Sequence, residues 1–327
     1  MRRIFISFGR YSFACLVFCL CAGWSSRERA ESFGAKARIN LTIADDNNVV
    51  VDNANVEVYF GLSVREGKSV KGISDDKGNF VADGKTTGEV YVNVSKKGFY
   101  KTTKKIELYN DEHREVYRGR WMPETIMTNV LLRKIINPIH LLKADGTIPI
   151  PTTNTWLGFD MALKDFTAPH GKGKEADCEV LFQWDGKPQP YSSFYSMDIR
   201  FSGKGAGAYR SVRNDESQFP WVYKASEGEF APLQIHMFRH RVNRNFEKEV
   251  FDQNHPLICR SRCRYDINGK LVSAHYSLII DLACSASWQD KGIFRFSYLF
   301  NSTANDRNLE EQNIYNTPNF GTIGGLE

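Results

Sequence analysis

The sequence has little cysteine, no marked excess of either charge and only one long apolar run. Seven of its 327 residues are cysteine, and 43 Lys and Arg residues face 38 Asp and Glu residues. Proteins that bind nucleic acid or anionic membranes by charge carry a clear basic excess, so we expect no nucleic-acid partner. Beyond Ala22 no run approaches the ~20 apolar residues that a membrane-spanning helix needs, so no transmembrane segment is expected there.

The one apolar run lies near the start of the sequence. Three arginines precede it, the apolar residues occupy positions 11–22, and small residues follow. A basic start, an apolar run of ~7–15 residues and a small-residue exit are typical of a secretory signal peptide. We therefore expect residues 1–23 to be a signal peptide, cleaved within 22–26, and the protein to be exported to the periplasm, the cell surface or the medium. An uncleaved anchor is the alternative. Cleavage removes the three arginines and leaves 40 basic residues against 38 acidic ones.

Four cysteines remain after the predicted cleavage: Cys178, Cys259, Cys263 and Cys284. An oxidising compartment favours disulfides between them. On a strand, Cys259 and Cys263 share a face but lie ~13 Å apart, too far to bond to each other. Each is therefore predicted to pair with Cys178 or Cys284, and buried free thiols are the alternative. A zinc site needs a second close pair of ligands, which the sequence lacks, so we expect no metal and no other cofactor.

Apolar residues alternate with polar ones through residues 37–109. Ile39, Leu41 and Ile43 share one strand face, and the segments VEVYF and EVYVNVS repeat the pattern. Turn residues separate these runs, as in Asp75-Asp76-Lys77-Gly78. Short strands divided by regular turns are typical of a β-sandwich.

The order of these segments resembles a known family. SDDKGNF, a spacer and then GEVYVNVSKKGFY are similar to the carboxypeptidase regulatory-like domain, a transthyretin-type (prealbumin-like) β-sandwich. The resemblance covers residues 36–110. It implies an accessory module that has no peptidase site of its own.

The rest of the chain is also rich in strand patterns. Residues 111–137 are predicted to be a linker with a connecting strand, 138–320 a larger antiparallel β domain and 321–327 a tail. IFRFSYLF places four aromatic rings on one face, and Asn268-Gly269 between alternating runs predicts a hairpin. The segments RKIINPIHLL, GFDMALKDFTAPHGKGKEADCEVLF and YLFNSTANDRNLE resemble exported bacterial proteins of unknown function. We therefore expect an all-β protein, with a prealbumin-like sandwich followed by a larger β domain.

No motif predicts catalysis, and we expect no catalytic residues. His236 and His240 lack the adjacent Glu of a zinc-protease helix, and on a strand they would lie ~13 Å apart, too far to share a metal. The Gly171–Lys174 loop is too short to cradle a phosphate in the manner of a P-loop.

Two groups of side chains are candidates for ligand binding. Aromatic residues near loops would stack on sugar or peptide, with core packing as the alternative: Trp156, Trp184, Tyr191 and Trp221. Arginines at alternate positions of one predicted strand would bind an anion if exposed and unpaired, with a solvated outer face as the alternative: Arg260, Arg262 and Arg264. Ion pairs with neighbouring acids would remove this second hypothesis.

These features predict an exported, non-enzymatic protein of the envelope or the extracellular space. Its role would be structural or ligand-binding, with carbohydrate, peptide or another envelope protein as the partner. The alternative is a hydrolase that acts on envelope carbohydrate or peptide from a site in the C-terminal domain. A cleft with convergent titratable side chains in that domain would favour the hydrolase, whereas a shallow aromatic surface would favour binding.

Overall fold

The computed structural model describes residues 25–62, 67–109, 115–184, 192–201, 203–228, 230–242, 245–286 and 292–313. The predicted signal peptide, the predicted tail and Tyr191 lie outside the described residues. Within these ranges the regular structure consists of strands and one helix, so the predicted all-β class is confirmed. No helix in these ranges is long and apolar enough to cross a membrane.

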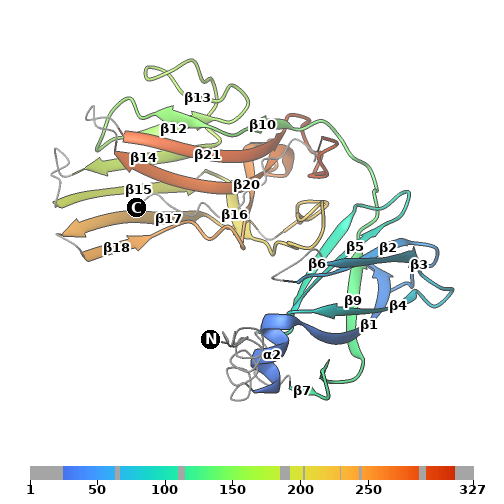
Figure 1. Cartoon of the computed structure of the whole chain (residues 1–327). Coiled ribbons are helices and arrows are strands. Elements are labelled where there is room, and N and C mark those ends of the chain that lie inside the picture. Colours follow the sequence, from blue (N-terminus) through green and yellow to red (C-terminus); the bar gives the residue numbers. More distant parts are fainter. Residues whose placement is uncertain are drawn as a thin grey trace, which may run out of the picture. The chain divides into compact units, whose positions relative to one another are not determined.

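The chain divides into two compact units (Figure 1). The first contains the chain up to Ile135 together with Asp215–Phe219, and the second contains the remainder. The first unit therefore extends beyond the predicted 36–110 domain and takes in most of the predicted linker. The reason is β9 (Ile126–Leu132), which pairs in parallel with β1 (Ala35–Asp45) along its whole length.

Two sheets form the first unit. One has the order β4-β1-β8-β7, with β9 also on β1, and the other has the order β3-β2-β5-β6. The remaining strands of these sheets are β2 (Asn55–Phe60), β3 (Lys68–Ile73), β4 (Asn79–Thr86), β5 (Glu89–Ser95), β6 (Thr102–Glu107), β7 (Val116–Tyr117) and β8 (Arg120–Trp121). Alternate residues of β1, β2 and β5 point into one shared core, including Ile39, Leu41 and Ile43 from β1 and Val90, Val92 and Val94 from β5. The predicted turn before β4 is confirmed, with Gly78 at a φ of 72°.

A short helix precedes β1. In α2 (Ser26–Phe33) the side chain of Ser25 accepts a hydrogen bond from the Glu28 amide, and the Glu28 carboxylate accepts one from the Ser25 amide. This reciprocal capping satisfies two amides that the first helical turn leaves without partners. The helix ends at Phe33, and the next residue, Gly34, caps it with a φ of 78°, which glycine adopts more easily than other residues.

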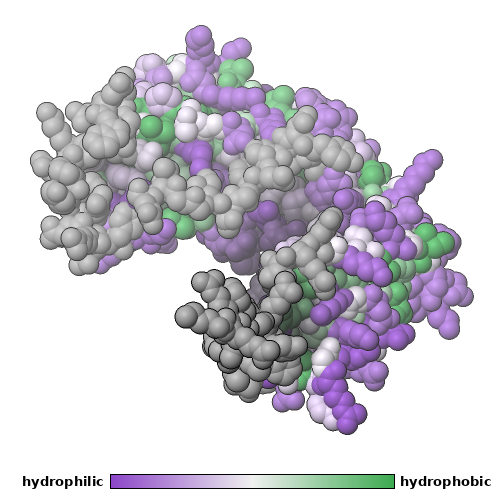
Figure 2. All heavy atoms as spheres, viewed as in Figure 1, coloured by the Kyte–Doolittle hydropathy of each residue, from purple (hydrophilic) through white to green (hydrophobic). Residues whose placement is uncertain are grey.

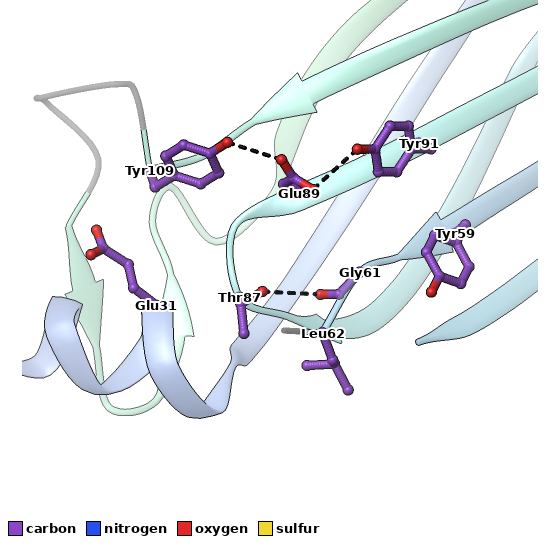
Figure 3. Close-up of a pocket in the computed structure, with 8 residues that line it drawn as sticks. All are labelled: Glu31, Tyr59, Gly61, Leu62, Thr87, Glu89, Tyr91 and Tyr109. Atoms are coloured by element: carbon purple, nitrogen blue, oxygen red, sulfur yellow. Dashed lines mark hydrogen bonds between the residues drawn. The ribbon is translucent and has the colours of Figure 1, made fainter. Parts of the chain in front are cut away.

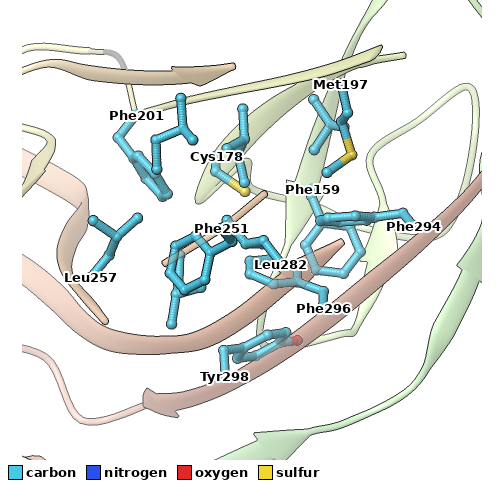
Figure 4. Packing of buried hydrophobic residues seen from close by; sticks show 14 of the residues in the cluster. Phe159, Cys178, Met197, Phe201, Phe251, Leu257, Leu282, Phe294, Phe296 and Tyr298 are labelled. Carbon is cyan, nitrogen blue, oxygen red and sulfur yellow. The ribbon is translucent and has the colours of Figure 1, made fainter. Parts of the chain in front are cut away.

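Two further sheets form the second unit. The first runs β10 (Leu142–Ala144), β21 (Gly292–Asn301), β20 (Leu271–Ala286), β19 (Leu257–Tyr265), β16 (Gly207–Arg210), with β11 (Thr147–Pro149) also on β21. The second runs β13 (Asp165–Phe166), β12 (Trp156–Asp160), β14 (Cys178–Trp184), β15 (Ser192–Phe201), β17 (Leu233–Val242), β18 (Asn245–Glu249). Aromatic side chains from both sheets meet in the core (Figure 4). Phe159 of β12 packs edge-on against Phe294 of β21, with ring centroids 5.8 Å apart. The strand and the aromatic face predicted from IFRFSYLF are confirmed.

The segments that resemble exported proteins hold backbone together within the second unit. The buried Glu310 carboxylate accepts hydrogen bonds from the amides of Ile136 (2.9 Å) and Asn137 (2.6 Å). The buried Glu311 carboxylate accepts one from the Leu141 amide at 2.8 Å. Buried carboxylates that accept backbone hydrogen bonds supply partners that a loop otherwise lacks. These segments therefore have an architectural role.

Residues Asp215–Phe219 extend the β6 edge of the first unit. The Thr103 amide donates to the Glu216 carbonyl and the Gln218 amide donates to the Lys101 carbonyl, both at 2.8 Å. Phe219 is fully buried, and its ring stacks on Tyr100 with centroids 5.1 Å apart. A segment far along the sequence thus covers an edge that would otherwise present unpaired backbone groups.

Figure 2 shows one face of the molecule coloured by hydropathy. Hydrophilic side chains predominate on the face visible in Figure 2, with hydrophobic ones scattered between them. This distribution is expected when the alternating apolar residues are gathered into the two cores.

Candidate functional site

A pocket of ≈ 570 Å³ lies at one end of the β3-β2-β5-β6 sheet, beside α2 (Figure 3). We call it the tyrosine pocket because three tyrosines contribute to its wall. Its lining residues are Glu31, Tyr59, Gly61, Leu62, Thr87, Glu89, Tyr91 and Tyr109. Figure 3 shows Tyr109, Glu89 and Tyr91 in a row, with Tyr59 next to Tyr91.

Strand alternation places the pocket side chains. Val90 and Val92 of β5 point into the core, so Glu89 and Tyr91 point to the opposite face. The same rule turns Tyr59 of β2 outward between two buried neighbours. Tyr59 and Tyr91 are directly opposite each other in the ladder, and their ring centroids lie 6.3 Å apart with the planes tilted by 46°.

Glu89 is the hydrogen-bonding centre of the pocket. One oxygen, Oε1, accepts from Tyr109 at 2.9 Å and from Lys105 at 2.8 Å, and the other, Oε2, accepts from Tyr91 at 3.1 Å. The bond from Lys105, followed by that from Tyr109, lowers the pKa of Glu89 against the opposing effect of burial. Glu89 is therefore an ionised acceptor at neutral pH and a poor proton donor.

The pKa values of the two tyrosines bonded to Glu89 are raised, in contrast to that of Glu89. Burial, followed by the bond to Glu89, raises the pKa of Tyr91, and the bond to Glu89 raises the pKa of Tyr109. Both hydroxyls consequently keep their protons through the neutral and mildly alkaline range. Lys105 also pairs with Glu107, and its ammonium lies 5.8 Å from the centre of the Tyr91 ring.

Replacing Glu89 by Gln is expected to lower the pKa of both tyrosines toward the ordinary value near ~10, because the negative charge that disfavours tyrosinate is removed. Tyrosinate absorbance during an alkaline titration measures this change. A Glu57→Gln variant, altered on the same sheet but outside the tyrosine pocket, serves as the control. Identical titration curves for the two variants would contradict the assignment of Glu89 as the acceptor.

The predicted aromatic platform is not assembled in the described part of the second unit. Trp156 is half-buried and lies under the Arg200 guanidinium, 3.9 Å from the ring centroid. Trp184 is on the opposite face of the same sheet, packed against the core. Trp221 is 4% exposed, with Arg213 over its ring, so the core alternative holds for Trp221.

The prediction that the three arginines form an exposed, anion-binding face is wrong. Arg262 Nη2 lies 2.7 Å from both Asp160 Oδ1 and Asp177 Oδ2, and only 14% of its side chain is exposed. Arg264 pairs with Glu175 at 2.9 Å, and Arg260 donates to the Gly205 carbonyl at 2.7 Å. The physical reason is an irregularity in β19, where the register with β20 shifts between Ser261 and Arg264 and Arg262 takes a φ of 50°. Strict alternation fails there, and the three arginines do not form one exposed row.

The four cysteines within the described residues are free thiols in the structure. Cys178 and Cys259 are buried in the core of the second unit, whereas Cys263 and Cys284 are half-buried. Burial raises the pKa of the Cys284 thiol to about 12, and it raises those of Cys178 and Cys259 as well. Disulfide pairing after export stays a prediction.

His236 and His240 lie on strand β17, as predicted. The Nδ1 atom of His236 is 3.0 Å from Asp198 Oδ1, and the ring of His240 packs edge-on against Phe194. Each imidazole therefore has its own local partner.

The sequence pattern identifies the buried positions, and the pocket residues lie between them, so the pattern did not predict the pocket. The valines at every second position of EVYVNVS identify the core face, and Glu89 and Tyr91 are the residues between them. In VEVYF, the residue between the buried Val58 and Phe60 is likewise a pocket residue, Tyr59. The helix that carries Glu31 could have been predicted from its capping pair, Ser25 and Glu28, because such a pair marks a helix start.

No family model and no curated protein matches the chain. Among solved structures, 3-chlorocatechol 1,2-dioxygenase from Rhodococcus opacus 1CP is 8% identical, with a TM-score of 0.26 over 32% of this chain and 62% of that one. Catechol 1,2-dioxygenase from Acinetobacter radioresistens, as the A72G mutant, is 16% identical, with a TM-score of 0.26 over 33% of this chain and 55% of that one. The dioxygenase domain of a Streptomyces sp. SirexAA-E fusion protein is 8% identical, with a TM-score of 0.25 over 32% and 83%. The match thus spans less than two thirds of the first two enzymes, and similarity at this level assigns neither a fold family nor an activity to this chain.

Proposed function

We propose that the protein is an exported, non-enzymatic binding protein that takes a carbohydrate or peptide ligand into the tyrosine pocket. The observation that carries this proposal is the pocket itself, in which Tyr91 and Tyr109 flank an ionised carboxylate fixed by three donors and Tyr59 lies beside Tyr91. Aromatic walls with a few placed polar groups are typical of small-ligand sites. Tyrosine supplies both an apolar face for stacking and a polar edge.

The state of Glu89 supports binding over catalysis. A general acid at neutral pH needs a raised carboxyl pKa, whereas the pKa of Glu89 is lowered. In the second unit, Asp160 and Asp177 are held by Arg262 and by backbone amides. Carboxylates bonded in this way are suited to holding structure, so the hydrolase alternative gains no support from them.

Export is supported by the sequence of residues 1–23, which has the charge and hydropathy pattern of a signal peptide. The resemblance of residues 36–110 to the carboxypeptidase regulatory-like domain supports the non-enzymatic role, because that family is an accessory module. A mature protein in the cell envelope or medium, shortened by the first 22–26 residues, is the expected result of fractionation and mass measurement. Full-length protein in the cytosol would contradict it.

Replacing Tyr91 by Ala is expected to weaken ligand binding about tenfold, a loss of about 1.4 kcal/mol, because one stacking face and one hydroxyl disappear. Calorimetric titration against a panel of soluble oligosaccharides and short peptides measures this change. Tyr117→Ala is the matched control, because Tyr117 is 58% exposed in the same unit and does not line the pocket. If a ligand of the wild-type protein binds both variants equally well, the tyrosine pocket is not its site.

A further inference from the structure

The direction of the hydrogen bonds in the tyrosine pocket indicates what kind of ligand group fits there. A tyrosine hydroxyl has one proton to donate, and Tyr91 and Tyr109 both direct theirs to Glu89. Toward a ligand, these two oxygens can then act only as acceptors. The Glu89 carboxylate between them is also acceptor-only. This row of the wall therefore matches a ligand group that is rich in donors.

The charged groups in and around the pocket include both signs. Its eight described lining residues include the carboxylates of Glu31 and Glu89 and no basic side chain. Just outside the lining, Lys105 bonds to both Glu89 and Glu107, and Arg27 pairs with Glu31. These three carboxylates face the two cations, and a third cation, Lys85, packs its side chain against Gly34 at the end of α2, so the described charges balance. The preference for a donor-rich ligand group therefore comes from the acceptors that line the wall and not from a net charge.

Two further features favour a cation. The C-terminal end of α2 lies beside the pocket, because Gly34 packs closely against the side chain of Leu62. A helix C-terminus carries partial negative charge. The second feature is the set of three tyrosine rings in the wall. The Lys105 ammonium already lies 5.8 Å from the Tyr91 centroid and repels a second cation there, so a ligand cation would meet the rings of Tyr59 and Tyr109. A tyrosine face attracts a cation placed within about 6 Å of its centre.

We infer that the tyrosine pocket recognises an ammonium group of the ligand, carried either by a lysine side chain of a peptide or by an amino sugar. This inference rests on the proposed function, because it names the ligand group that the proposed binding site selects. The ammonium would donate to the oxygens of Tyr91 and Tyr109 and would lie near the carboxylates of Glu89 and Glu31. Its three donors match a wall in which the acceptors outnumber the donors.

Two matched pairs of probes test the inference on the full mature chain. One pair is a lysine-containing tripeptide and the same tripeptide with Nε-acetyllysine, and the other is a glucosamine hexamer and an N-acetylglucosamine hexamer. Within each pair, acetylation removes the charge and keeps the rest of the molecule. We expect the amine form of at least one pair to bind at least about tenfold more tightly than its acetylated form, and added salt to weaken that binding.

Two variants connect the result to the pocket. Glu89→Gln is expected to weaken amine binding about tenfold, because it removes the central negative charge. Glu57→Gln, on the same sheet but outside the pocket, is expected to leave the affinity unchanged. Circular dichroism and thermal unfolding of both variants show that the comparison is made between folded proteins.

The outcomes separate the inference from the proposed function. Binding of only one amine probe identifies the source of the ammonium and supports the inference. Equal binding of the amine and acetylated forms overturns the inference, while loss of that binding in Tyr91→Ala would still support the proposed function. Failure of both amine probes to bind also overturns the inference. The proposed function then stands if a neutral member of the wider panel binds and Tyr91→Ala weakens it, and it fails if no member binds.

Discussion

Replacing Arg262 by Met is expected to lower the free energy of unfolding of the second unit by about 3–5 kcal/mol. The Asp160 and Asp177 side chains that Arg262 bridges are only 2% and 0% exposed. Methionine fills a similar volume but leaves the two carboxylates without their shared cation. Removing one partner of a buried ion pair is costly because an uncompensated buried charge remains.

Other bonds to the two carboxylates persist in this variant. Asp177 still accepts from Ser261 Oγ at 2.5 Å and from the Met161 amide at 2.8 Å, and Asp160 still accepts from the Lys174 amide at 2.8 Å. Burial raises the pKa of Asp160, but the amides of Lys174, Leu163 and Glu175, together with the charge of Arg262, outweigh it and lower the pKa. A lowered pKa means that the stability from Asp160 is present above about pH 4 and is lost as the pH falls through the folded-state pKa. We therefore expect the free energy of unfolding of Arg262→Met to be lower than that of the wild-type protein at neutral pH and to fall less as the pH is lowered.

Differential scanning calorimetry of the full chain measures the loss, and Arg264→Met is its control. Arg264 also pairs with an acid, but its side chain is 70% exposed, so its removal is expected to cost at most about 1 kcal/mol. Adding Asp177→Asn to Arg262→Met is expected to restore part of the stability, because it removes one of the unpaired charges. Equal costs for the Arg262 and Arg264 variants would show that the buried cluster does not stabilise the unit.

Replacing Phe219 by Ala is expected to destabilise the first unit by about 3–5 kcal/mol. The ring is fully buried, stacked on Tyr100 and covered by the guanidinium of Arg133, which lies 4.9 Å from its centroid. Arg133 Nη1 also donates to the Phe219 carbonyl at 2.8 Å. Truncation leaves a cavity between two side chains and weakens the attachment of residues 215–219 to β6.

Hydrogen exchange is the suitable measurement, because it reports on single amides in a chain with two units. In Phe219→Ala the amides of Thr103 and Gln218, which form the bonds between β6 and this segment, are expected to exchange much faster. Met127→Ala is the control, because Met127 lies on β9 of the same unit and is 63% exposed. Unchanged protection at Thr103 in the Phe219 variant would contradict an anchoring role.

Local patterns predicted the parts of the fold that depend on neighbouring residues. Alternation in RINLTIAD and IFRFSYLF identified which side chains enter the cores. The Asn268-Gly269 hairpin joins β19 to β20 with Gly269 at a φ of 79°, and the Asp266 carboxylate accepts the amides of Asn268 and Lys270. In each case the chemistry that decides the conformation lies within a few residues.

Features that depend on distant residues could not be predicted in this way. The parallel pairing of β9 with β1 and the pairing of residues 215–219 with β6 join segments far apart in the sequence, and no local pattern names the partner. The positive φ of Arg262 breaks an alternation that continues without interruption in the sequence pattern. The tyrosine pocket has the same origin, because it needs β2, β5 and α2 at one end of a sheet. Alternation shows that Tyr59 and Tyr91 face outward, whereas only the register shows that they are opposite each other.

The most direct test is to map ligand contacts by NMR on protein with labelled tyrosine rings, titrated with the panel member that binds most tightly. The tyrosine pocket predicts saturable shifts of the ring signals of Tyr59, Tyr91 and Tyr109, with the signal of the exposed Tyr117 unchanged. Saturable binding that leaves the three pocket tyrosines unshifted and perturbs only signals of the second unit would contradict the account.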